Sequence, residues 1–231
     1  MAYDAGNYAL AWRYMLQALR LSHTVDNRLF GARVLAAMSH QALHLAHVPL
    51  AVDLALAARE GVKHAAPPKA LAMLAAMEAC AQAAAQQPAA CASALGAAEH
   101  AMDQVSADDT PDWLDFDEGG LRGHMARALR DLQLSREAAH HAEASLALCQ
   151  DEHYRTRAQR NAILATTQLQ LGDVEVAAAT GLRVIADARQ VRSGHVDSDL
   201  AALVRTIEAS HSTTACDFLQ QARELLTIRA G

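Results

Sequence analysis

The sequence predicts an all-α protein, built as a superhelical stack of helix pairs of the α-solenoid kind. Two observations lead to this prediction. The chain is 52% hydrophobic but only 4% aromatic, so its apolar content is mostly Ala and Leu, which favour close-packed helices over sandwiches or barrels. A pattern of small residues also recurs with a period near 40 residues. With 231 residues the chain has room for one continuous solenoid.

The repeat is clearest at the N-terminal end, where Gly6, Tyr8, Ala11, Met15 and Ala18 follow one another. Their pattern, G-x-Y-x-x-A-x-x-x-apolar-x-x-A, resembles the turn and second helix of a tetratricopeptide repeat. Small side chains let two helices approach closely. The position of Ala11 is again occupied by a small residue in four further copies: Ala51, Cys91, Ala138 and Ala177.

These marker residues are 40, 40, 47 and 39 residues apart. The spacing predicts a single repeat domain over residues 1–231, with copies at approximately 1–25, 28–61, 69–102, 112–150 and 154–190 and a degenerate C-terminal cap at 195–228. The value of 47 indicates an insertion, which we place in the polar segment 103–112. Within it, Thr110-Pro111-Asp112 has the composition of a helix start.

The first copy begins at its turn, so its second helix lacks the usual first helix as a neighbour. We expect the apolar face that carries Tyr8, Leu10 and Tyr14 to be covered by an upstream domain, a partner protein or a second copy of the chain. A homodimer is one form that this contact can take.

Charge and motifs argue against several classes of function. A net charge of −6 gives no attraction to phosphate backbones, so we expect no direct nucleic-acid binding. No apolar run reaches the ~20 residues that span a bilayer, and the start does not resemble a signal peptide, so we expect a cytoplasmic protein without membrane contact. No nucleophile elbow, dinucleotide fingerprint or paired-carboxylate site is present, so we expect neither an enzyme nor a cofactor.

Histidines and glycines each allow two interpretations. His40, His44 and His47 have the spacing of one helical stripe and could bind a metal ion, but no thiol or carboxylate has a matching spacing. We therefore favour polar groove or structural histidines and expect no metal. Gly120 and Gly123 fall in a predicted helix, where they indicate either a close helix crossing or close approach of a ligand to the backbone.

The resemblance to tetratricopeptide repeats also implies where a ligand would bind. In such repeats the first helix of each pair lines a concave groove, at fixed positions counted from the marker. Small residues at these positions leave volume, and arginines there favour an anionic group. The implied ligand-binding residues are Arg33, His40, His44, Cys80, Gly123, Arg127, Arg130, Gln159, Thr166 and Gln170. The alternative is a solvated groove with no small ligand.

Three segments carry a more specific resemblance. Met1–Tyr8, Gln17–Ser22 and Leu35–Ala42 resemble the sensor region of actinobacterial helix-turn-helix transcriptional regulators, here without the N-terminal DNA-binding domain. The resemblance implies a regulatory domain that senses a small molecule or peptide and acts through a DNA-binding partner protein. A protein–protein interaction scaffold, docking through the exposed N-terminal helix, is the alternative.

Overall fold

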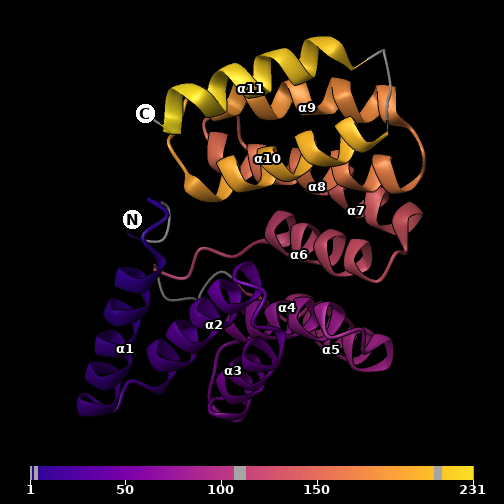
Figure 1. The fold of residues 1–231 in the computed structure, drawn as a ribbon. Coiled ribbons are helices and arrows are strands. Elements are labelled where there is room, and N and C mark those ends of the chain that lie inside the picture. The colour runs from indigo at the N-terminus through magenta and orange to yellow at the C-terminus, as the bar shows by residue number, and fades with distance from the viewer. Residues whose placement is uncertain (1, 3–4, 107–112, 211–214, 231) are drawn as a thin grey trace.

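The computed structural model describes residues 2, 5–106, 113–210 and 215–230. These residues form eleven α-helices and no strand, which confirms the predicted all-α class (Figure 1). The helices are α1 (Tyr8–Thr24), α2 (Arg28–His44), α3 (Val48–Glu60), α4 (Pro68–Ala84), α5 (Pro88–Met102), α6 (Glu118–Asp131), α7 (Ser135–Ala147), α8 (Tyr154–Gln170), α9 (Val174–Ala188), α10 (Gly194–Ala209) and α11 (Cys216–Ala230).

Neighbouring helices pack in pairs, and the even-numbered helices connect one pair to the next. Helices α2 and α3, α4 and α5, α6 and α7, and α8 and α9 make the most extensive contacts. Contacts between α2 and α4, α4 and α6, α6 and α8, and α8 and α10 then form a continuous layer. In Figure 1 the chain passes from α1–α5 at the bottom through α6 to α7–α11 at the top. None of the helices in the described residues has the length and apolar character needed to cross a bilayer.

The five small marker residues occupy one position in the pairs. Each is the fourth residue of its helix, in α1, α3, α5, α7 and α9 respectively. All are buried: Ala11, Ala51, Cys91, Ala138 and Ala177. The sequence repeat is therefore a repeat of one structural contact, in which the start of an odd-numbered helix lies directly against the preceding or following helix.

The turns repeat as well. A residue with positive φ lies two positions before α1, α2, α3, α5, α7 and α9, at Gly6, Asp26, Ala46, Gln86, Gln133 and Gly172. The next amide then bonds back to a carbonyl five residues earlier, as His47 N does to Ala42 O at 2.8 Å. This is the Schellman arrangement, which ends a helix and reverses the chain within a few residues. The same turn in each place sets a similar angle between helices.

The insertion between α5 and α6 ends differently from the sequence prediction. Thr110-Pro111-Asp112 lies outside the described residues, and residues 113–117 are not helical. Helix α6 begins at Glu118, and Asp117 Oδ1 accepts a bond from Gly120 N at 2.7 Å. Leu114 and Phe116 are buried just before it. Both side chains belong to the first core, so the segment just before α6 is fixed to it.

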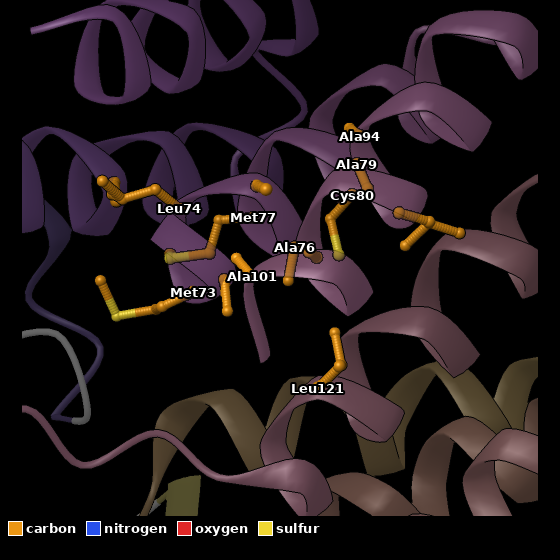
Figure 2. Packing of buried hydrophobic residues seen from close by; sticks show 14 of the residues in the cluster. Met73, Leu74, Ala76, Met77, Ala79, Cys80, Ala94, Ala101 and Leu121 are labelled. Atoms are coloured by element: carbon orange, nitrogen blue, oxygen red, sulfur yellow. The ribbon is translucent and has the colours of Figure 1, made fainter. Parts of the chain in front are cut away.

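Two large cores stabilise the molecule. The first joins α2–α6 around α4, of which nearly every residue from Ala72 to Ala83 is buried. Figure 2 shows side chains of α4, such as Leu74 and Cys80, among those of its neighbours, such as Ala94 and Leu121. The second core joins α8–α11. A smaller cluster of α6, α7 and α8 residues lies between them.

Two glycine-to-alanine substitutions test how closely the second core is packed. An added Cβ at buried Gly181 of α9 would lie 2.5 Å from Cε2 of Phe218 in α11. We expect Gly181→Ala to lower the free energy of unfolding, because overpacking costs about 1–3 kcal/mol and exceeds the gain of up to ~1 kcal/mol in helix propensity. Gly96→Ala in α5, where a Cβ meets nothing within 4 Å, should instead stabilise the protein. Urea unfolding of both variants measures the difference, and equal stability would contradict the close α9–α11 contact.

Candidate functional site

The even-numbered helices surround three adjoining cavities, with volumes of about 420, 210 and 350 Å³. The first two share His40, His124 and Gln159, and the last two share Arg127 and Ile163. Side chains from α1, α2, α4, α6, α8 and α10 all contribute to the lining. Residues from both cores thus meet at one continuous space, although they are far apart in the sequence.

Most of the ligand-binding residues implied by the repeat frame lie at this space. Eight of them line the three cavities: Arg33, His40, Gly123, Arg127, Arg130, Gln159, Thr166 and Gln170. The structure therefore brings together residues that the sequence placed only by counting from a marker.

Cys80 and His44 do not line these cavities, contrary to the prediction. Cys80 is buried in the core of α4, where its thiol donates to the carbonyl oxygen of His124 at 3.4 Å. Burial raises the pKa of this thiol to about 12. His44 is instead hydrogen-bonded through Nε2 to the hydroxyl of Tyr8 at 2.7 Å. Both side chains serve packing and contacts within the chain.

Arg127 determines the state of His40. Its Nη1 lies 2.9 Å from Nε2 of His40, and since a guanidinium can only donate, Nε2 must accept. The proton of a neutral His40 is then on Nδ1. Burial, followed by the charge of Arg127, holds the pKa of His40 well below its ordinary value. His40 is therefore a neutral hydrogen-bonding group beside a fixed positive charge.

Helix α10 contributes residues that the sequence reasoning missed. The ring of His195, which is buried, lies edge-on to those of His40 and His44, with centroids 5.5 and 4.6 Å away. Asp199, one turn further along α10, lines the third cavity and is close enough to Arg127 to interact electrostatically. Burial nevertheless raises the pKa of Asp199. These contacts join the C-terminal half to α2 across the cavities.

A signal for α10 was present in the sequence. Asp199 is the sixth residue of α10, as Arg33 is of α2 and Gln159 is of α8. Counting from the start of the helix would have selected it, but counting from the marker would not, because Asp199 lies 20 residues before Leu219 whereas Arg33 and Gln159 lie 18 residues before Ala51 and Ala177. The sequence analysis predicted this pair only as a degenerate C-terminal cap. The fourth residue of α11 is Leu219, where the other odd-numbered helices carry a small residue. His124 was missed because it lies one position beyond the selected Gly123.

The structure bears on the two interpretations of Gly123 and on the proposed histidine stripe. A Cβ at Gly123 would lie 3.1 Å from Oγ of Ser145 in α7, so this glycine permits a close helix crossing while it also lines a cavity. His47 follows the end of α2 and is exposed, so it does not extend a stripe with His40 and His44. The described residues contain no group of three or more His, Cys, Asp or Glu side chains that could hold a metal ion.

The residues proposed for partner binding differ in exposure. Tyr8 is half-buried and bonds to His44 within the chain, while Leu10 is also half-buried. Tyr14 is 57% exposed. Only Tyr14 of the three is therefore well placed to contact another molecule.

The buried histidines predict how stability depends on pH. Burial lowers the pKa of His124 from 6.5 to about 4, so the unfolded chain binds this proton more readily. The stability that neutral His124 contributes is complete above pH ~6.5 and is lost as the pH falls towards 4. Between pH 7 and 5 we expect a loss of at most about 2 kcal/mol from this residue, or roughly 4–8 °C in Tm. His40 acts in the same direction, whereas Asp199, with its raised pKa, acts in the opposite one.

Thermal unfolding of the wild type and of His124→Gln between pH 7.5 and 5 measures this effect. The variant should show a flatter dependence of Tm on pH. Parallel curves would show that His124 is not buried in its neutral form.

Comparison with known proteins does not identify a relative. No protein-family model and no curated protein matches this sequence. A function has to be inferred from the chemistry of the cavities and of the helix faces.

Proposed function

We propose that this chain is a regulatory repeat domain of the tetratricopeptide kind, which binds a small molecule or a peptide in the space between its even-numbered helices. The observation that carries the proposal is the convergence of Arg33, Arg127 and Gln159, from α2, α6 and α8, on adjoining cavities. Ligand sites are concave, largely apolar and carry a few polar groups that orient the ligand. The cavity that Arg33 lines combines apolar residues such as Met73 and Phe116 with polar ones, whereas the two adjoining cavities are mostly polar.

The repeat assignment is supported by three features of the same pairs. The marker is small and buried at the fourth residue of five helices. The left-handed turn recurs two residues before six helices. Contacts between pairs run mainly through alternate helices. A solenoid of tetratricopeptide-like pairs combines all three.

Binding is favoured over catalysis by the state of the polar groups. The thiol of Cys80 is buried with a raised pKa, so it is a poor nucleophile. The Nε2 atom of His40 is occupied by Arg127 and is not free to act as a base. Neither group is arranged to activate a ligand.

A regulatory role follows from the position of the cavities between two cores. A ligand that contacts Arg33 on α2 and Gln159 on α8 would bind both halves at once. Such a ligand favours the arrangement of the halves in which both contacts form. The change in that arrangement is what a partner protein would detect.

A thermal-shift screen of metabolites and short peptides tests ligand binding. At 100 times its Kd a ligand adds about 2.7 kcal/mol of stability, or roughly 5–10 °C in Tm. We expect at least one compound to produce such a shift, and Arg127→Gln to remove it. Arg136→Gln, at an exposed position of α7, is the control and should retain the shift. A broad screen without any shift would contradict the proposal.

The second candidate is an interaction scaffold, which the outer face of the N-terminal pair favours. Tyr14, Leu21 and Val25 are 57%, 64% and 70% exposed. A further cavity of about 340 Å³ lies between α1, α2 and α3, lined in part by Leu19 and Leu35. Exposed apolar side chains in one region are typical of protein contacts.

Light scattering after size exclusion tests the scaffold in its homodimeric form. A dimer should form at micromolar concentration and dissociate in the double variant Leu21→Asp, Val25→Asp, because each carboxylate would be buried in an apolar contact. Leu148→Asp, on α7's exposed C-cap position, should remain dimeric. A monomer at all concentrations, with no partner recovered in pull-downs, would remove this candidate.

A further inference from the structure

We infer that the ligand of the largest inner cavity is a small carboxylic acid with an apolar body, and that Arg33 binds its carboxylate. The inference rests on the proposed function and specifies its ligand. It depends on the contacts of Arg33, on the side chains that line the cavity and on the net charge of that lining.

Arg33 differs from the other arginines near the cavities. Arg130 pairs with Asp131 at 2.6 Å, Arg127 donates to His40 at 2.9 Å, and Arg160 donates to the carbonyl of Ser145 at 2.7 Å. No hydrogen bond or ion pair to Arg33 occurs within the described part of the chain. Its side chain is nevertheless half-buried, and burial lowers its pKa.

A half-buried guanidinium without an acceptor is costly, because it loses solvation and gains no bond in return. It remains charged at any physiological pH. A bound anion would supply the missing acceptors, and a carboxylate can accept two parallel N–H bonds from one guanidinium. The position of Arg33 is therefore explained by a ligand better than by the fold alone.

The walls around Arg33 indicate the rest of the ligand. Met15, Met73, Met77 and Phe116 line the same cavity of about 420 Å³. Methionines adapt to irregular apolar shapes, and this volume lies at the small end of the range for small-molecule sites. An apolar body of moderate size would fill the space, whereas a folded partner segment would not.

The charge of the lining also favours a single negative group. Arg33 and Arg155 line the cavity together with one carboxylate, Asp115. His124 has a pKa near 4, so it adds no positive charge at neutral pH. A polyphosphate would need several cationic groups, and the cavity offers too few for one. A monocarboxylate matches both the charge and the apolar walls.

The test compares matched acids and amides on the full chain. The probes are octanoate, 4-phenylbutyrate and indole-3-acetate, each with its primary amide, titrated calorimetrically at pH 7.5. We expect at least one acid to bind roughly 10- to 100-fold more tightly than its amide, as charged hydrogen bonds do relative to neutral ones. Arg33→Gln should remove this preference while the folded protein still binds acid and amide equally. Arg33→Lys should retain part of it.

Arg28→Gln is the control, because Arg28 lies on the same helix with its side chain 79% exposed, and it should keep the wild-type preference. If acids and amides bind equally, or if compounds of another class bind and no acid does, the inference is wrong but the proposed function stands. If neither these probes nor the broad screen shows any binding, the proposed function fails and the inference fails with it. An acid preference that persists in Arg33→Gln would assign the carboxylate to another residue.

Discussion

At the start of α1, α3, α5, α7 and α9, a small side chain lets one helix lie directly against its partner. Ala51, Ala138 and Ala177 are completely buried at this contact. A larger residue would separate the helices, and dispersion contacts would be lost along both. This contact recurs in each pair, and the turns between helices are similar. The even-numbered helices therefore lie on one side of the stack. The cavities exist because of that arrangement.

The inner surface combines fixed charge with neutral imidazoles. Arg127 holds His40 in one tautomer, and burial keeps His124 uncharged. Neighbouring cations would repel one another if these histidines were protonated. His40 and His124 therefore add polar groups but no positive charge to the lining, where Arg127 is charged.

Much of this arrangement was accessible from the sequence. Composition predicted the all-α class, and a count from the marker residues placed eight residues on the cavities. The count worked because helices of similar length and turns of similar geometry keep the same face turned inward. It failed at Cys80, where α4 is so enclosed by α2, α5 and α6 that its groove position is core. It also left out Asp199 of α10, which lines a cavity, because the last pair was taken as a cap.

The contact of His195 with His40 and His44 sets this chain apart from a simple linear array of repeats. In a linear array each unit contacts only its neighbours, so the end units fray first and unfolding spreads inward. Here α10 contacts α2 across the cavities. Loss of a unit in one half removes a support of the other, so fraying at an end is coupled to the opposite half. The molecule should then lose its structure as one cooperative unit, and any molecule that occupies the space between α2 and α10 acts on the stability of the whole chain.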